Sequence, residues 1–280
     1  MLEILDSLSL PGDAAKANDD AFGHVDGAAV VFDGATSLGE SLLPGPSDAA
    51  WIAHFGARRL MAHMREGDAP QDALRHALED AEKSFAGLRR RAPKEKWEIP
   101  TASMMFVSET AEGFEARWFG DCAALVKRPD TAIEVVGEAF DKRARESQRV
   151  ARISKERNLA PTAGIDRAEY LPALRAARNH VNSGRHWAFS PDHRAADHVE
   201  SQIVAAPRGA ILLLASDGFL AAASDYGLYD AQTLVDAAQA KGLAAIGAEI
   251  RACEQADSLG IRFPRFKKSD DATALLLRLA

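Results

Sequence analysis

Cysteine is scarce in this sequence. Only Cys122 and Cys253 occur in 280 residues, and they lie far apart. That number and spacing exclude a disulfide framework and a zinc site built from cysteine pairs. So few cysteines are typical of an intracellular protein, and we expect this protein to be cytoplasmic.

Long apolar runs and long basic stretches are also missing. No apolar run approaches the roughly 20 residues that a bilayer-spanning helix needs, so we expect no membrane segment. The N-terminal sequence MLEILDSLSLPG contains acids and lacks a basic segment followed by an apolar core, which argues against a signal peptide. The formal net charge is −7, and the absence of a basic stripe argues against a nucleic-acid binder. An acidic substrate stays open, because bound divalent cations would reverse the local field.

What is present suits a protein with an ordinary buried core. Hydrophobic residues make up 47% of the chain and charged residues 27%. A length of 280 residues is long for one domain but within the range of a large sandwich or barrel. We expect a single domain over residues 1–280.

Short apolar segments that stop at Asp or Gly, with the segments that pair with them, predict strands. These segments are Ala28–Phe32, Thr101–Val107, Phe114–Phe119, Cys122–Lys127, Ile211–Ala215 and Thr273–Leu279. Strand clusters at both ends of the chain, separated by helical patterns, favour an α+β layered domain over a regular βαβ alternation.

Helical spacing of apolar residues predicts the helices. One covers Ser47–Met64, with Ser47 or Asp48 as the N-cap, and a second follows Pro70. Asp230–Ala256 gives one or two more, with a break at Gly242. The Arg-rich stretch 139–198 is only partly periodic, and we interpret it as a lid or flap insertion.

Acidic residues stand where the predicted strands begin or end. Taken along the chain, they are Asp19 and Asp20, Asp33, Asp121, Asp217 and Asp270. Neighbouring strands lie only about 4.8 Å apart, so carboxylates at their ends can converge. Oxygen ligands alone select hard cations such as Mg²⁺, Mn²⁺ or Ca²⁺. Taken singly, each aspartate is better explained as a helix cap or a turn residue, so the prediction depends on the joint pattern.

A pair of such ions, about 3.5–4 Å apart, would acidify a bridging water and hold a phosphoryl group in line with it. Glycine follows the aspartate in Asp33-Gly34 and Asp217-Gly218. Because glycine lets the backbone come close, its carbonyl can join the ligands.

Five motifs occur in order between Asn18 and Leu277: NDDAFG, VVFDGAT, FGDCAAL, LLLASDGF and SDDATALLL. Together they resemble the motifs of the metal-dependent serine/threonine protein phosphatases of the protein phosphatase 2C type. The resemblance implies a four-layer α-β-β-α sandwich, in which two antiparallel sheets are flanked by helix pairs. It also implies a cofactor of two, or three, Mn²⁺ or Mg²⁺ ions and a phosphoprotein substrate.

The resemblance further implies roles for individual residues. Asp33 would bridge two ions and position the attacking water, with the Gly34 carbonyl on one ion. Asp217 and Asp270 would complete the first ion's shell. Asp20, with Asp19, would act on or near the second ion through water. A third, weaker site would use Asp121 with Asp217.

This chain departs from the family pattern at several positions. Many members clamp the phosphate with an Arg before the first acidic pair; here Lys16 is the nearest cation, displaced by one position, and a solvated surface lysine is the alternative. Ala35 stands where some members have a general-acid His, so protonation of the leaving group would fall to a metal-bound water or another group. Cys122 replaces a usual Ser and Asp271 a usual Asn. The carboxylate ligands are intact, so we expect an active enzyme.

The preferred function is hydrolysis of phosphoserine or phosphothreonine on proteins by metal-activated water. A catalytically weak regulatory module of the same fold and a phosphatase for small metabolites are the alternatives. A cysteine-dependent phosphatase, suggested by the Cys122-x5-Arg128 spacing, is disfavoured because the intervening AALVK contains no glycine and is typical of a strand. The basic residues Lys267 and Lys268 precede the last aspartates, where they balance nearby acids or assist phosphate binding.

Overall fold

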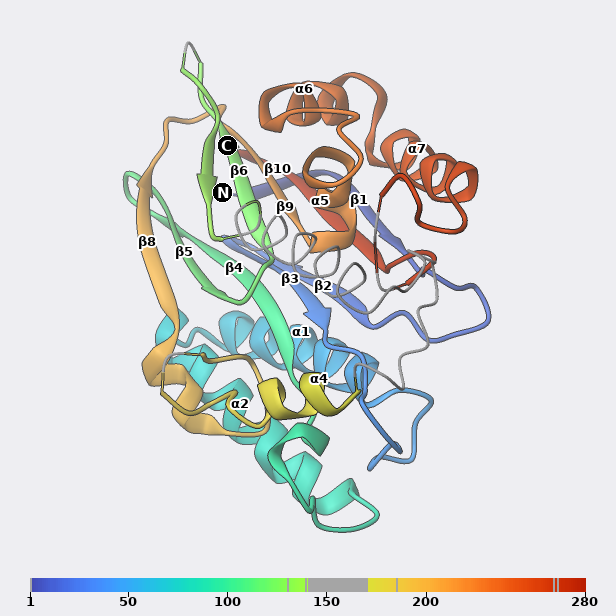
Figure 1. The fold of residues 1–280 in the computed structure, drawn as a ribbon. Helices are drawn as coiled ribbons and strands as arrows, with labels where there is room; N and C mark the ends of the chain where they lie inside the picture. The colour runs from blue at the N-terminus through green and yellow to red at the C-terminus, as the bar shows by residue number, and fades with distance from the viewer. Residues whose placement is uncertain are drawn as a thin grey trace.

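Two five-stranded sheets form the centre of the molecule (Figure 1). The computed structural model describes residues 2–129, 131–138, 140, 171–184, 186–263, 265 and 267–280. The first sheet has the order β1 (Leu2–Leu10), β10 (Ala272–Leu279), β9 (Ile211–Ala215), β6 (Ala123–Lys127), β7 (Glu134–Val136). The second has the order β2 (Asp20–Val25), β3 (Ala28–Gly34), β4 (Ala102–Thr110), β5 (Gly113–Phe119), β8 (Glu200–Ala205). All neighbouring strands are antiparallel, and Leu2 pairs with Leu279, so the two ends of the described chain lie side by side.

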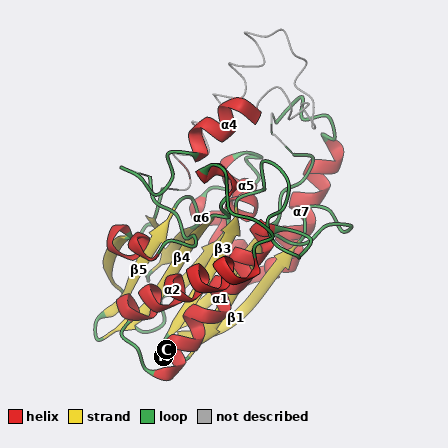
Figure 2. Cartoon of the chain, turned by 90° about the horizontal axis from the view of Figure 1, so that it is seen from below, coloured by secondary structure: helices red, strands yellow, loops and turns green. Residues whose placement is uncertain are grey.

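Helices cover the outer face of each sheet (Figures 1 and 2). The second sheet carries α1 (Asp48–Glu66) and α2 (Pro70–Leu88). The first carries α5 (Asp217–Ser224), α6 (Ala231–Lys241) and α7 (Leu243–Ala256). The described residues also contain the helical segments η1 (Lys96–Glu98), α4 (Leu171–Arg178) and η3 (His193–His198). The predicted α-β-β-α sandwich is therefore confirmed.

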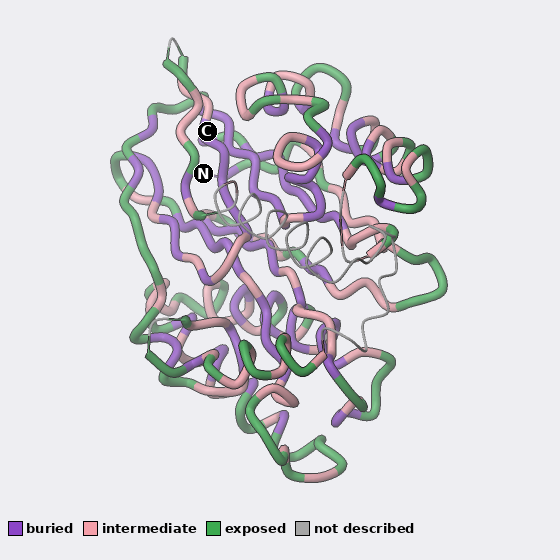
Figure 3. The backbone as a smooth tube through the Cα atoms, viewed as in Figure 1, coloured by how far each residue is buried: buried purple, intermediate pink, exposed green. Residues whose placement is uncertain are grey.

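Apolar side chains alternate between the two faces of the strands and so form three apolar layers. On β3, Val30 and Phe32 pack against α1 and α2, whereas Ala29 and Val31 face the first sheet. Side chains alternate between the two faces of a strand, so a continuous apolar run serves both layers. Figure 3 shows the consequence: the strands at the centre are buried, and exposure is concentrated on the outer helices and loops.

The predicted helix boundaries follow from local capping. The Ser47 hydroxyl accepts a hydrogen bond from the Ala50 amide at 3.2 Å, which confirms Ser47 as the N-cap of α1. Gly67 ends α1 in the left-handed region, with φ of 96°. Gly242, with φ of 82°, separates α6 from α7 and confirms the predicted break.

Strands β1, β2, β7 and β8 and helix α5 were not predicted. β1 and β8 are edge strands with mostly exposed or half-buried residues, so they lack the apolar run that marked the central strands. Of the predicted lid 139–198, residues 139, 141–170 and 185 lie outside the described residues, and 171–198 contain α4 and η3. Among the described residues, no helix combines the length and the apolar character that crossing a bilayer requires.

Candidate metal centre

Four of the five chain segments that carry the predicted aspartates are strand ends at the same side of the sandwich. Asp20 begins β2 and pairs directly with Asp33 near the end of β3. Residues paired in this way have their side chains on one face, with Cβ atoms about 4.5–5.5 Å apart. Asp33 shares its face with Val31, which points into the space between the sheets. From the opposite sheet, Asp217 follows β9 and Asp270 precedes β10.

The electrostatics of Asp33 show that these carboxylates are close to one another. The pKa of Asp33 is raised well above its ordinary value, first by burial and then by the charges of neighbouring carboxylates. Those neighbours are Asp217, Asp20, Asp121 and Asp270. The structure therefore brings five of the predicted aspartates into one centre, where like charges oppose one another.

Asp20 is the most deeply buried of the group, with 1% of its surface exposed. Burial and the charges of Asp270 and Asp271 raise the pKa of Asp20 well above its ordinary value. The Ser216 hydroxyl opposes this shift by donating a hydrogen bond to Asp20 Oδ2 at 2.7 Å. Ser216 also accepts from the Thr273 amide at 3.0 Å, so its hydroxyl links β9, β10 and β2.

Sequence reasoning missed Ser216 as a site residue. Its signal was present in LLLASDGF, where a small hydroxyl residue stands between a buried strand and a candidate ligand. Such a residue is placed to orient the ligands of a neighbouring strand.

Asp271 organises the backbone around the centre. Its carboxylate accepts hydrogen bonds from the Gly12 amide at 2.6 Å and the Asp19 amide at 2.7 Å. The backbone carbonyl of Asp19 in turn accepts a hydrogen bond from the Gly34 amide at 2.9 Å. The side-chain carboxylate of Asp19 accepts a hydrogen bond from the Ser47 hydroxyl at 2.5 Å. Asp271 thus ties the N-terminal segment to β10 and holds Asp19 against the end of β3 and the start of α1.

Two glycines allow this close packing of backbone. A Cβ added to Gly34 would lie 2.5 Å from the carbonyl oxygens of both Asp19 and Ala49. A Cβ added to Gly218 would lie 1.9 Å from the Asp271 carbonyl oxygen. The glycines that follow Asp33 and Asp217 are therefore required by packing.

Among the described residues, Lys267 is a cation that contacts this group of acids. Its Nζ lies 2.5 Å from Asp270 Oδ1. Burial alone would lower the pKa of Lys267, but the charges of Asp270, Asp33 and Asp217 outweigh it and raise that pKa above its ordinary value. Lys267 therefore stays charged, and this agrees with the prediction of a basic residue that balances nearby acids.

Lys16 and Cys122 lie in quite different environments. The Lys16 side chain is 78% exposed and pairs with Asp13 at 3.5 Å on the surface. Cys122 is fully buried directly before β6, and burial, followed by the charge of Asp33, raises the pKa of its thiol well above the usual range. A buried thiol held protonated is a poor nucleophile, which argues against the cysteine mechanism.

The described end of the predicted lid packs on the loop that follows Gly34. From α4, Arg178 donates to the Thr36 carbonyl at 2.9 Å and Arg175 to the Leu38 carbonyl at 2.7 Å. The Arg175 guanidinium also stacks on Trp97, 4.1 Å from the ring centroid. These contacts fix the backbone immediately downstream of Asp33.

The donors of the centre fit hard divalent cations. The converging side chains offer oxygen only, and burial together with their mutual repulsion raises the pKa of Asp33 and of Asp20. A bound cation would relieve that repulsion and favour the ionised forms.

Comparison with known proteins agrees with this arrangement. The family model described as protein phosphatase 2C matches residues 13–241, most of the chain. Among curated protein sequences, none matches this chain.

Solved structures with a similar fold are distant in sequence. A PPM Ser-Thr phosphatase from Mycobacterium smegmatis, in complex with cacodylate, has a TM-score of 0.59 at 15% identity, covering 99% of this chain and 100% of that one. The serine/threonine phosphatase PstP/Ppp of Mycobacterium tuberculosis has a TM-score of 0.58 at 13% identity, covering 99% and 98%. PppA of Pseudomonas aeruginosa has a TM-score of 0.55 at 17% identity, covering 98% and 96%. At these identities the likeness shows a shared fold.

The matching family model, the sandwich and the converging aspartates agree with one another, and the chain belongs to the protein phosphatase 2C family.

Proposed function

We propose that this protein hydrolyses phosphoserine or phosphothreonine on protein substrates, using Mn²⁺ or Mg²⁺. The observation that carries the proposal is the convergence of four other carboxylates on Asp33, whose pKa is raised first by burial and then by their charges. A similar fold with 13% identity and a TM-score of 0.57, the catalytic domain of the phosphatase PstP, is in complex with two manganese ions. Two ions, with a third and weaker one, are proposed for this chain.

The proposed ligands divide between the two sheets. Asp33 and the Gly34 carbonyl would contribute from β3, with Asp19 and Asp20 beside them, and Asp217 and Asp270 from the facing sheet. Asp121, in the turn between β5 and β6, would serve the third ion with Asp217. When bound, the ions supply positive charge to the phosphoryl oxygens and lower the pKa of a water ligand.

Residues of the chain would hold and orient the reacting groups. The Asp33 carboxylate would orient the attacking water, and Ser216 would keep Asp20 in place through its 2.7 Å hydrogen bond. Lys16 and Lys267 are the candidates for phosphate contact. The ion pair of Lys267 with Asp270 favours Lys267, whereas Lys16 projects into solvent. Ala35 has no proton to give, so a water or another group would protonate the leaving group.

The test is hydrolysis of para-nitrophenyl phosphate by purified protein with Mn²⁺ or Mg²⁺, repeated with chelator. Asp217→Asn should lower the metal-dependent rate by at least about 100-fold, since even ligand-orienting residues cost 10–100-fold. Asp236→Asn is the matched control, because Asp236 lies on α6 and pairs with Lys127 at 2.5 Å. A rate unaffected by chelator or by Asp217→Asn would contradict the proposal.

A second assay addresses the substrate class. Phosphopeptides and small phosphorylated metabolites would be compared by kcat/KM at a fixed Mn²⁺ concentration. We expect the phosphopeptides to be preferred. Preference for a metabolite would redirect the proposal to that alternative, and metal binding without any ester hydrolysis would support the regulatory module.

A further inference from the structure

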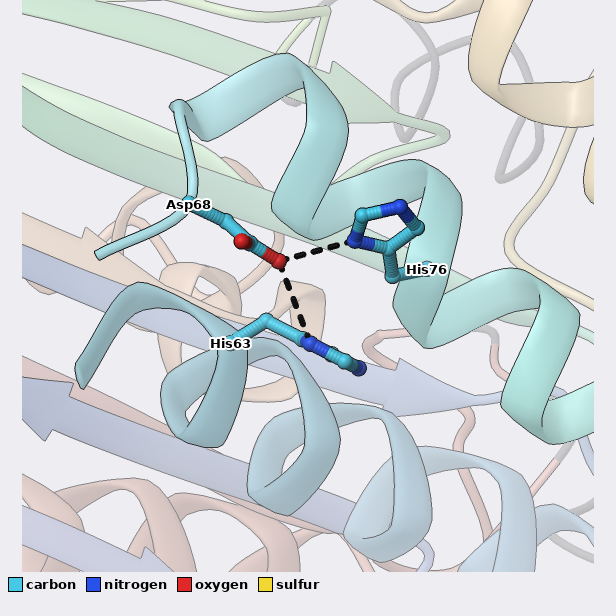
Figure 4. A group of neighbouring side chains, drawn as sticks. All are labelled: His63, Asp68 and His76. Carbon is cyan, nitrogen blue, oxygen red and sulfur yellow. Dashed lines mark hydrogen bonds and ion pairs between the residues drawn. The ribbon is translucent and has the colours of Figure 1, made fainter. Parts of the chain in front are cut away.

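A second group of ligand-type side chains lies where α1 is joined to α2. His63 belongs to the last turns of α1, Asp68 to the connection and His76 to α2. One ligand atom from each lies within 4.8 Å of the others. Figure 4 shows the two imidazole rings converging on one carboxylate oxygen of Asp68.

The distances suit a shared cation. Asp68 Oδ2 lies 3.2 Å from His63 Nδ1 and 2.8 Å from His76 Nδ1. With zinc-ligand bonds of about 2.0–2.2 Å, tetrahedral ligand atoms are separated by roughly 3.3 Å. A cation could therefore replace the protons between these atoms with only small side-chain shifts.

His63 is held as metal-binding histidines commonly are. Its side chain is only 12% exposed, and its second ring nitrogen, Nε2, lies 2.9 Å from Asp80 Oδ2. Asp80 is fixed in turn by Arg59, whose Nε donates to the same oxygen at 2.7 Å. A carboxylate on the far nitrogen sets the tautomer and orientation of the ring, so that Nδ1 is directed at the proposed ion.

The connection between the helices holds Asp68 in place. The Asp68 amide donates to the His63 carbonyl at 3.1 Å, and the Gly67 amide donates to the Met64 carbonyl at 3.2 Å. Gly67 adopts a φ of 96°, and Pro70 fixes the first turn of α2. The three ligands are thus arranged before any ion binds, which reduces the entropy cost of binding.

We propose that His63, Asp68 and His76 form a binding site for Zn²⁺ or a similar transition-metal ion. Two imidazoles and one carboxylate favour such ions over Mg²⁺ and Mn²⁺, for which oxygen ligands are preferred. Glu66, whose Oε2 lies 3.8 Å from His63 Nδ1, or a water completes the fourth position.

This site is separate from the aspartate centre. Ser47 at the N-terminus of α1 contacts Asp19, whereas His63 stands near its C-terminus. A helix of 19 residues is about 28 Å long, so an ion here would join α1 to α2 and would not touch the phosphate. The proposal is independent of the proposed phosphatase activity.

The test uses full-length protein without a polyhistidine tag, treated with chelator and titrated with Zn²⁺ by calorimetry. Asp33→Asn removes the bridging aspartate of the other centre and should retain one Zn²⁺ equivalent. In that background, His76→Gln should weaken Zn²⁺ binding by at least about 100-fold, and Asp80→Asn by about 10–100-fold. Co²⁺ gives a second measurement, because four-coordinate Co²⁺ with nitrogen ligands absorbs visible light much more strongly than six-coordinate Co²⁺ on oxygen.

His193→Gln is the matched control. His193 Nδ1 lies 2.7 Å from Glu82 Oε2, so these two side chains form a similar histidine-carboxylate pair. No third ligand is grouped with this pair in the part of the chain that the structure describes. We expect His193→Gln to bind Zn²⁺ as the parent does. Asp68→Asn, nearly equal in size, tests the site again if His76→Gln folds poorly. Failure of the Asp33→Asn protein to bind Zn²⁺, or equal binding after His76→Gln and Asp68→Asn, would overturn the proposal.

Discussion

Helix α1 has a group of ionisable side chains near each end, and the two groups differ in charge balance. Near its N-terminus, aspartates from both sheets converge, and burial with mutual repulsion raises the pKa of Asp33 and of Asp20. Near its C-terminus, Asp68 faces two histidines. There the His76 hydrogen bond lowers the pKa of Asp68, and the Asp68 hydrogen bond raises that of His76.

The contrast separates a centre in which carboxylates repel one another from one in which a carboxylate is bonded to histidines. At the aspartate centre, Lys267 offsets part of the negative charge, and a divalent cation would offset more of it. At the histidine group, a metal ion must displace the proton shared by His76 and Asp68. We expect hard cations to affect the first group most, and both transition metals and pH to affect the second.

Asp33→Asn should give the largest effect. It removes the proposed bridging ligand, so metal-dependent hydrolysis of para-nitrophenyl phosphate should fall by more than about 100-fold. In chelator, the same variant should melt at a higher temperature than the parent, because a buried repulsive charge is lost. Each kcal/mol gained would raise Tm by roughly 2–4 °C.

The pH dependence of this gain follows from the raised pKa of Asp33. The folded protein holds the proton to higher pH than the unfolded chain does, so raising the pH from about 3.8 through the raised pKa costs stability. The Tm advantage of Asp33→Asn in chelator should therefore grow with pH and shrink when Mn²⁺ is added. An advantage independent of both would show that Asp33 is not repelled by its neighbours.

Ser216→Ala should have an intermediate effect. It removes the donor to Asp20 and leaves the buried Thr273 amide without its acceptor, at a cost of about 1–3 kcal/mol. The Mn²⁺ concentration needed for half-maximal activity should also rise by about 10-fold, as for other ligand-orienting residues.

The control for this variant is Ser224→Ala. Ser224 lies at the other end of α5, where its hydroxyl bonds the Leu220 carbonyl at 3.2 Å and Asp225 Oδ2 at 2.7 Å. We expect little change in the metal requirement. If Ser216→Ala lost stability but kept the parent's Mn²⁺ dependence, Ser216 would support the fold without orienting Asp20.

Sequence patterns predicted the centre of the fold better than its edges. The buried strand Ile211–Ala215 and the capped helix beginning at Asp48 were identified because apolar spacing and Ser47 mark them locally. β8 was missed because it is an edge strand whose residues are mostly exposed, including Ile203 at 75%. An exposed edge strand carries little of the alternation on which sequence analysis depends.

Sequence patterns also identified only those residues of the candidate site that are marked by their local sequence. The aspartates were identified because each stands beside an apolar strand, whereas Ser216 and Asp271 act through partners distant in sequence. Asp271 bonds the Gly12 and Asp19 amides, about 250 residues away along the chain, and only the tertiary structure brings these together. The histidine group was also missed, since the H-x4-D-x7-H spacing of His63, Asp68 and His76 is no familiar motif.

The smallest expected effect lies in the titration of His76. Its Asp68 hydrogen bond raises its pKa above 6.5, so the pair stabilises the fold below that pH and loses this contribution as pH rises through the raised pKa. Ring-proton NMR should show the His76 pKa falling toward 6.5 in Asp68→Asn, while that of His193, which depends on Glu82, stays raised. Saturating Zn²⁺ should abolish the His76 titration near neutral pH and leave that of His193 in place, because a bound ion excludes the proton from Nδ1. Equal responses of both histidines to Zn²⁺ would mean that the third ligand, His63, confers no advantage in binding the ion. The difference in charge between the two ends of α1 would then come from protonation alone.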